Sequence, residues 1–78
     1  MKDTLHYIIS SIVTLPDAVS LEESEEDETI NFVITVDKED MGKIIGKEGK
    51  VIRSIRNIMK IVAMKHNKRI NISLAENA

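Results

Sequence analysis

The segment that decides the fold reads Gly42-Lys43-Ile44-Ile45-Gly46-Lys47-Glu48-Gly49-Lys50-Val51-Ile52. Two of its glycines, Gly46 and Gly49, stand three positions apart between two stretches with helical apolar spacing. Because glycine suits the left-handed backbone that ends a helix, the segment predicts a short helix over about 38–45 that Gly46 stops. A longer helix opens at Gly49 and Lys50 and runs to about His66. With little side-chain bulk at the corner between the two helices, another backbone can approach it closely.

The corner also has the charge to receive an anion. The N-terminus of the longer helix directs unpaired N–H groups outward, with a partial positive charge, and Lys43, Lys47 and Lys50 add full charges nearby. This arrangement suits a sugar-phosphate chain. It is not a Walker A loop, which needs four residues between its glycines and a Ser or Thr after the lysine, and the dinucleotide pattern GxGxxG is absent.

Outward from the corner, the chain alternates helical and extended patterns. The stripe Leu5, Ile8, Ile9, Ile12 and Val13 predicts a helix over about 4–14, which Pro16 ends. Short strand character at 19–21 precedes the acidic run 22–28, which we expect to be a solvated loop because six acids in seven residues repel one another. Alternating apolar residues predict strands over 29–36 and 70–74. The expected fold class is α+β, in the order helix, strand, strand, helix, helix, strand. A three-stranded sheet covered on one face by three helices is the economical packing.

Length and charge limit the function further. The chain has 78 residues, a formal net charge of −2 and no cysteine, so we expect one domain without a disulfide scaffold or thiolate metal site. Residues 1–41 hold two basic and eleven acidic side chains, whereas residues 42–78 hold nine basic and two acidic ones. The basic half favours an anionic partner, provided that its cations share a face. No apolar run is long enough to span a membrane and the N-terminus lacks a secretory signal, so the expected location is the cytoplasm.

No catalytic site is apparent. His6 and His66 are sixty positions apart on different predicted helices, and no paired carboxylates or Ser/His set stand at a useful spacing. The acidic run lacks any pattern that would fix metal geometry. We therefore expect no enzyme activity, no metal site, no cofactor and no small-molecule substrate.

The residues Ile44-Ile45-Gly46-Lys47-Glu48-Gly49-Lys50-Val51-Ile52 resemble the KH domain signature, an apolar pair followed by G-x-x-G and x-x-Ile. The extra helix and strand before the βααβ core are similar to the type II (prokaryotic) arrangement. The likeness extends over essentially the whole chain, 1–78, to the small bacterial single-KH proteins of the KhpA type. It implies a single KH domain that binds single-stranded RNA and acts as a post-transcriptional regulator or RNA chaperone.

The resemblance assigns roles to individual residues. It makes Gly46, Lys47, Glu48 and Gly49 a loop that clamps the nucleic-acid backbone. It places Ile44, Ile45 and Ile52 on the helix side of an apolar groove for bases, although these isoleucines also fit a plain core. Lys43, Lys50 and Arg53 become phosphate contacts. The sheet side of the groove cannot be assigned by residue. The type II order also implies that the acidic loop borders the groove, so this loop and Glu48 oppose RNA binding and predict modest, salt-sensitive affinity.

A second surface is predicted on the longer helix. Ile61 and Met64 fall outside its buried stripe of Val51, Ile52, Ile55, Ile58, Met59 and Val62, and lie near Ser54 and Asn57. Exposed apolar residues on so small a domain favour an interface, and the resemblance implies a homodimer or a heterodimer with a larger KH-containing protein. Tyr7 and Phe32 are both expected to be structural. Two alternatives stay open: a KH-fold adaptor for protein association with weak or lost RNA binding, and a DNA-binding KH module.

Overall fold

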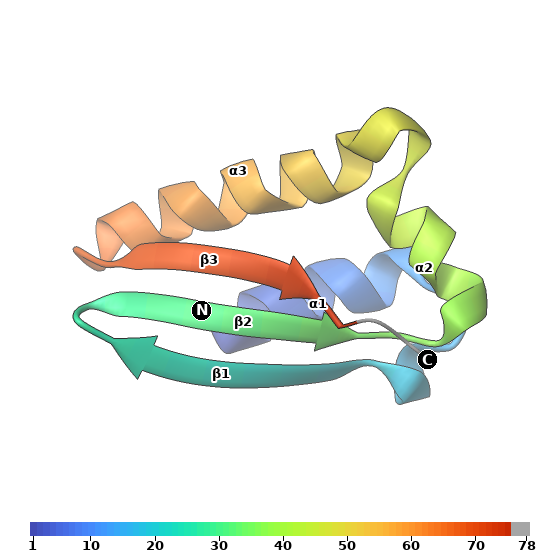
Figure 1. Cartoon of the computed structure of the whole chain (residues 1–78), viewed down its shortest axis with the longest axis horizontal. Coiled ribbons are helices and arrows are strands. Elements are labelled where there is room, and N and C mark those ends of the chain that lie inside the picture. The colour runs from blue at the N-terminus through green and yellow to red at the C-terminus, as the bar shows by residue number, and fades with distance from the viewer. Residues whose placement is uncertain (76–78) are drawn as a thin grey trace.

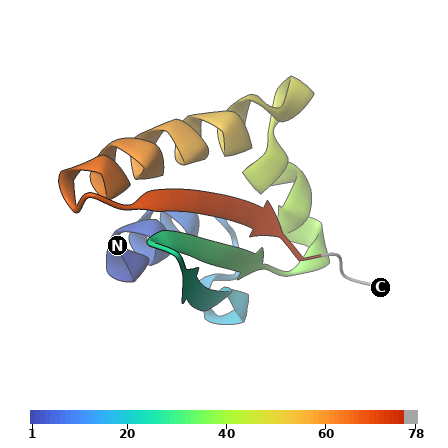
Figure 2. The ribbon, with the colours of Figure 1, turned by 60° about the vertical axis from the view of Figure 1, so that its left-hand side comes forward.

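In the computed structural model, which describes residues 1–75, helices cover one face of a three-stranded sheet (Figure 1). This confirms the predicted α+β class and element order. The second view shows the sheet with its other face free of helices (Figure 2). The elements are α1 (Lys2–Ile12), the 3-10 turn η1 (Pro16–Ala18), β1 (Ser20–Glu26), β2 (Thr29–Thr35), α2 (Lys38–Ile45), the 3-10 turn η2 (Lys47–Gly49), α3 (Lys50–Lys65) and β3 (Arg69–Leu74).

The sheet has the order β1-β2-β3 and is mixed. β1 and β2 form an antiparallel hairpin whose turn residues, Asp27 and Glu28, both have positive φ. β2 and β3 are parallel, with Phe32 opposite Ile72. Parallel neighbours need a crossover connection, and α2 and α3 supply it. The crossover places the corner between these helices well away from the β1–β2 turn (Figure 1).

The core lies between the helices and the inner face of the sheet. Alternate residues of β2 point inward, and Phe32 at the centre is fully buried. The apolar positions of α1 and α3 meet them at helical spacing, with Leu5, Ile9 and Met59 fully buried. Both patterns agree with the predicted stripes. No helix within residues 1–75 is long and apolar enough to cross a membrane.

The acidic run is where the prediction of a loop was wrong. Residues 20–26 form β1, paired along its full length with β2, and only Asp27 and Glu28 make a turn. An edge strand exposes most of its side chains, so glutamates remain hydrated on it while their backbone pairs. Leu21 alone is buried in β1. Charged side chains also protect a free sheet edge from pairing with another chain.

Two apolar assignments were also wrong. Tyr7 is 75% exposed and so is not part of the core, whereas Phe32 is, as expected. Ile58 was placed in the buried stripe of the long helix but is 46% exposed. The buried stripe instead continues to Ala63, one turn after Met59.

Candidate nucleic-acid interface

The corner between α2 and α3 is a tight exposed turn, and it interrupts the helix as predicted. We call Gly46–Gly49 the GxxG turn. Gly46 has φ 74° and ψ 176°, and Gly49 has φ 74° and ψ 16°. Between them Glu48 also adopts a left-handed conformation, with φ 57° and ψ 26°. The Gly49 N–H donates to the Gly46 carbonyl oxygen at 3.2 Å, which closes the turn.

Gly46 is required by packing as well as by its backbone angles. A Cβ at this position would lie 2.3 Å from Cγ2 of Val51 and 2.9 Å from the Val51 backbone nitrogen. The start of α3 therefore sits directly against the Gly46 backbone. Gly49 has open space around the position of its missing Cβ. Its glycine is needed for conformation and leaves room for a ligand.

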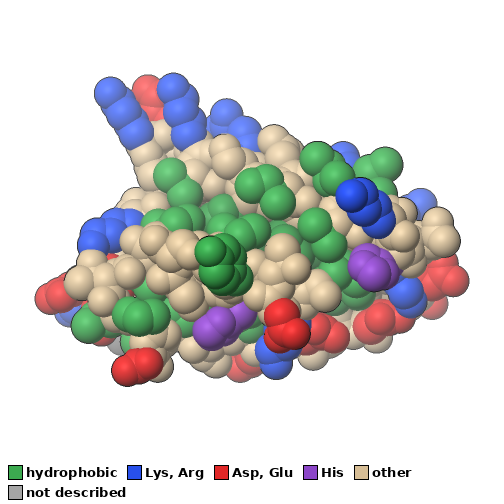
Figure 3. Space-filling view, turned by 180° about the vertical axis from the view of Figure 1, so that it is seen from behind, with side chains coloured by type: hydrophobic (Ala, Val, Ile, Leu, Met, Phe, Trp, Pro, Cys, Tyr) green, Lys and Arg blue, Asp and Glu red, His purple; other side chains and the backbone are tan. Residues whose placement is uncertain are grey.

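Cations surround the turn. Lys47 and Lys50 are exposed, and within residues 1–75 neither has an ion-pair partner. Arg53 lies one turn along α3, and its Nη2 donates to the Glu48 carbonyl oxygen at 3.3 Å. This contact holds the guanidinium beside the turn with its other N–H groups available. Figure 3 shows basic and acidic side chains projecting together from the corner where α2 meets α3.

Lys43 is engaged elsewhere. Its ammonium lies 3.5 Å from Oδ1 of Asp40 and also donates to the hydroxyl of Thr14. Asp40 is 1% exposed and its two carboxylate oxygens accept the backbone N–H groups of Thr14 and Leu15, both at 3.0 Å. The hydrogen bond from Thr14 is the main cause that lowers the pKa of Asp40, against the opposing effect of burial. These contacts of Asp40 and Lys43 tie the segment after α1 to α2, and we call them the Asp40 latch. For Lys43, a phosphate contact would compete with the latch.

The three predicted groove isoleucines lie in different environments. Ile44 is fully buried and Ile52 nearly so, which leaves them in the core that supports the corner. Ile45, the last residue of α2, is 38% exposed beside Gly46. Of the three, Ile45 therefore offers surface to a ligand, and its contact with a base stays a prediction.

The sheet side of a groove, which the sequence left unassigned, is the edge strand β3. A furrow of about 330 Å³ separates it from α3, lined by Arg56, Asn57 and Lys60 of the helix and Ile70, Asn71 and Ile72 of the strand. We call this the α3–β3 furrow. Nε of Arg56 crosses it to donate to the Ile72 carbonyl oxygen at 3.2 Å. The alternation of apolar and polar residues over 70–74 predicted a strand. The sequence does not reveal that this strand pairs with β2 and so forms the edge of the sheet beside α3.

The acidic residues lie mostly away from this furrow, because β1 and β3 are opposite edges of the sheet. The exception is the hairpin turn, where the Arg69 N–H donates to the Glu28 carbonyl oxygen at 3.0 Å. Lys68 forms an ion pair of 2.7 Å with Glu25, and this hydrogen bond raises the pKa of Lys68. Residues 1–75 contain no group of acidic or histidine side chains suited to a metal ion.

The residues predicted for a dimer interface divide between two surfaces. Ile61 is 59% exposed and lies with Ser54 on the outer side of α3, opposite its buried stripe. Ile58 is close to them in helical position. Asn57 and Met64 instead lie on the β3 side of the helix, where each lines a cavity. Among the predicted set, Ser54 and Ile61 therefore share a surface with Ile58.

Comparison with known proteins agrees with this fold. The model of the KhpA/KhpB KH domain matches residues 2–74. The RNA-binding protein KhpA of Chlamydia caviae is 42% identical over 76 residues, covering 97% of each chain. That of Clostridium acetobutylicum is 39% identical over 95% of this chain and 99% of its own. That of Listeria monocytogenes is 32% identical over 97% and 100%.

KH domains are not an enzymatic family, so the prediction that the chain is not an enzyme is confirmed. The match extends over nearly the full length of both this chain and its relatives. It includes the two strands and two helices that flank the GxxG turn. The chain therefore belongs to the KhpA/KhpB family of KH domains.

Proposed function

We propose that the chain binds single-stranded RNA and that the GxxG turn clamps the RNA backbone. The observation that carries this proposal is the exposed turn itself, where Lys47 and Lys50 lie beside the start of α3 and form no ion pair with any of the described residues 1–75. The relatives named RNA-binding proteins support the choice of ligand. A KH turn of this kind holds four backbone nucleotides.

The proposed mechanism assigns separate tasks to the corner and the furrow. At the corner, the small glycines admit the sugar-phosphate chain, while Lys47, Lys50 and the first N–H groups of α3 attract phosphates. Bases then turn toward Ile45 and the α3–β3 furrow, whose floor includes the half-buried Ile70. With Tyr7 on α1 and Phe32 in the core, stacking on aromatic rings contributes little. Binding therefore depends on charge and is weakened by salt.

The test replaces the two central residues of the turn, as Lys47→Asp with Glu48→Asp. Aspartate tolerates the left-handed backbone of position 48 better than most residues, so circular dichroism should show an unchanged fold. We expect affinity for short oligouridylates to fall at least tenfold at low salt, measured by fluorescence anisotropy. Lys2→Asp is the matched control, because it makes the same change of charge in the first turn of α1, away from the corner.

Retained affinity in the double variant would refute the clamp. A deoxyuridylate series of the same lengths tests the DNA-binding alternative. Equal affinity for the ribose and deoxyribose strands would show that the turn does not recognise the 2′-hydroxyl and would favour the DNA-binding alternative. Higher affinity for the ribose strands supports an RNA ligand.

The proposed cellular role is that of a cytoplasmic post-transcriptional regulator or RNA chaperone. A domain with one short clamp contacts few nucleotides and suits many transcripts rather than one. Crosslinking in the native host, followed by sequencing of the bound RNA, tests this role. The role is supported if the wild-type chain crosslinks to transcripts that the chain with Lys47→Asp and Glu48→Asp no longer binds. Equal recovery by the variant would favour the adaptor alternative.

Protein association is the second candidate, favoured by the exposed Ile58 and Ile61 on the outer side of α3. Apolar side chains are also visible across the helical face (Figure 3). We propose that this face pairs two copies of the chain, or this chain with a larger KH-containing protein. Ile61→Asp should then give a folded monomer in sedimentation, whereas Ser24→Asp, on the opposite sheet face, should leave the dimer intact. A wild-type chain that is monomeric at high concentration would refute the pairing of two copies.

A further inference from the structure

Asp40 is a buried titratable group that the proposed clamp does not use. It lies in the first turn of α2 and is the one charged side chain among residues 1–75 that is buried. Its carboxylate accepts the backbone N–H groups of Thr14 and Leu15, both at 3.0 Å. A buried carboxylate has lost its water, so it depends on such hydrogen bonds and on a nearby cation. In the Asp40 latch that cation is Lys43.

Lys43 lies between the latch and the GxxG turn. It follows Asp40 by three positions in α2 and precedes Gly46, the first residue of the turn, by three. Its ammonium is directed back along the helix, 3.5 Å from Oδ1 of Asp40, and donates to the Thr14 hydroxyl. The turn begins about 4.5 Å further along the helix axis, at 1.5 Å per residue. Because lysine has a flexible stem of four carbons, the same ammonium can turn to either end.

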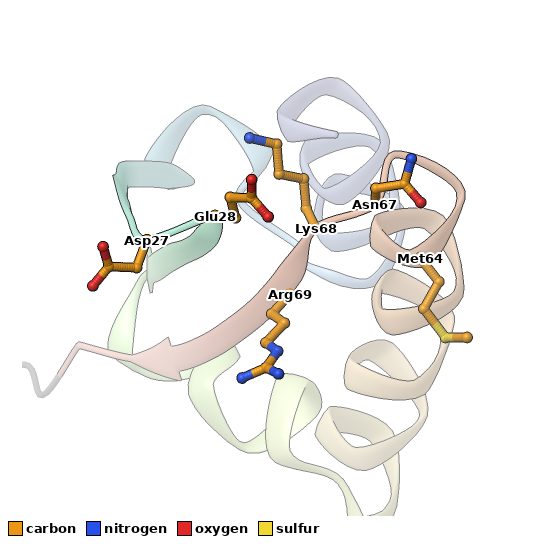
Figure 4. Close-up of a pocket in the computed structure, with 6 residues that line it drawn as sticks. All are labelled: Asp27, Glu28, Met64, Asn67, Lys68 and Arg69. Atoms are coloured by element: carbon orange, nitrogen blue, oxygen red, sulfur yellow. The ribbon is translucent and has the colours of Figure 1, made fainter.

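The latch holds Lys43 more firmly than a surface ion pair holds a lysine. Lys43 has two acceptors, and its departure would leave Asp40 buried without a cation. The other ion pair among residues 1–75 joins Lys68 to Glu25, whose side chain is 46% exposed, so water can replace the lysine there. Figure 4 shows Lys68 near Glu28 of the β1–β2 turn, at the end of α3 remote from the GxxG turn. Of these two paired lysines, Lys43 is beside the clamp and is the harder to withdraw.

Resting on the proposed function, we propose that Asp40 and Thr14 set the affinity of the corner for RNA by withholding Lys43 from the phosphates. Neither residue touches the RNA. Both act through Lys43, which contacts a phosphate only when a change in the latch releases it. Lys47 and Lys50, which form no ion pair within residues 1–75, are the cations of the clamp. Loosening the latch therefore adds one phosphate contact to the same clamp.

Thr14→Val tests the proposal without altering the charge of the chain. The exposed valine loses the hydroxyl that accepts from Lys43, while the backbone N–H of position 14 still donates to Asp40. Affinity for hexauridylate, measured by fluorescence anisotropy at low salt, should rise about threefold, and the log–log salt dependence should steepen by about 0.7, the value for one phosphate on a single strand. Thr14→Ser retains the hydroxyl and should bind as the wild-type chain does.

Lys43→Gln, alone and combined with Thr14→Val, shows whether the gain passes through this lysine. Alone it should change the affinity by less than about twofold, because the latch already withholds the ammonium. Combined with Thr14→Val it should abolish the gain in both affinity and salt dependence, which a merely structural effect of the valine would not do. Thr4→Val makes the same substitution at an exposed position of α1 and should change neither quantity. Circular dichroism should show an unchanged fold for each chain.

Two results overturn this inference. The first is a Lys43→Gln effect as large in the wild-type chain as in the Thr14→Val chain, because Lys43 would then already contact RNA. The second is a Thr14→Val chain with wild-type affinity and salt dependence. Either result leaves the clamp supported, provided that the chain with Lys47→Asp and Glu48→Asp loses binding. A wild-type chain that binds no hexauridylate overturns both this inference and the proposed function.

Discussion

The sharpest test of the corner is an alanine series at the three glycines, because the structure assigns each a different cost. At Gly46 the backbone angles of φ 74° and ψ 176° are almost restricted to glycine, which costs a side chain about 1–3 kcal/mol. The new Cβ would also lie 2.3 Å from Val51 Cγ2, an overpacking worth about 1–3 kcal/mol more. Alanine returns about 0.4–1 kcal/mol by restricting the unfolded chain. We therefore expect Gly46→Ala to cost about 3 kcal/mol.

The other two glycines serve as internal controls. Gly49 has a left-handed backbone but open space at its Cβ position, so Gly49→Ala should cost only about 1 kcal/mol. Gly42 lies inside α2 with nothing within 4 Å of that position. Gly42→Ala should stabilise the chain by about 0.5–1 kcal/mol, because glycine is a poor helix former.

Urea unfolding followed by far-UV circular dichroism at 25 °C measures all three. A domain of this size has a free energy of unfolding of roughly 4–12 kcal/mol, so the Gly46 variant should remain measurable. In a Val51→Ala background the cost of Gly46→Ala should shrink by about 1 kcal/mol, because the closest contact is gone. A Gly46→Ala cost equal to that of Gly49→Ala, with no coupling to Val51, would refute the close packing at the corner.

Three further predictions concern charge. Asp40→Asn should destabilise the chain at neutral pH by leaving a backbone N–H of the Asp40 latch without its acceptor. Because the pKa of Asp40 is lowered, chiefly by the hydrogen bond from Thr14, the stabilisation by its carboxylate is present above the ordinary aspartate pKa of about 3.9. It should be lost as the pH falls below that value, so that unfolding curves of the two chains converge in acid; a constant gap would contradict this. Glu48→Asn removes the acid inside the turn, and asparagine tolerates the left-handed backbone at this position. This variant should bind oligouridylates several-fold more tightly. An unchanged affinity would show that the Glu48 carboxylate does not face the phosphates. Lys50→Gln should lessen the log–log salt dependence of RNA binding by about 0.7, the value for one phosphate contact on a single strand, and an unaltered slope would remove Lys50 from the interface.

Local pattern predicted most of the fold, because the deciding signals were local. Asp37, directly before α2, caps the helix by accepting the Glu39 N–H at 2.9 Å, a role that the local sequence chemistry of aspartate favours. The break at Gly46 and the left-handed Asn67 after α3, with φ 57°, follow from glycine and asparagine chemistry. At the start of α1, by contrast, the helix begins at Lys2, before the predicted start at about residue 4, and no side chain caps it.

What the sequence did not reveal depends on contacts between distant segments. The acidic β1 is a strand because β2 pairs with it, and this tertiary pairing overrides the repulsion that predicted a loop. An acid in the first turn of a helix, such as Asp40, is usually exposed and stabilises the helix N-terminus, so the local sequence gives no sign that it is buried. Its burial depends on Thr14 and Leu15, some 25 residues away. The furrow beside β3 likewise exists only once β3 has paired with β2.

The parallel pairing of β2 and β3 also has a consequence for folding kinetics. Asn31 and Asn71, whose side chains hydrogen-bond across the two strands, are 40 positions apart. Closing so long a segment is slow compared with forming a hairpin or a helix. We therefore expect the β1–β2 hairpin and α3 to form early and β3, which completes the furrow, to join last. A chain in which β3 has not docked would leave one edge of β2 unpaired, and stopped-flow measurements on an Ile72→Val variant should show whether β3 docks after the rate-limiting barrier.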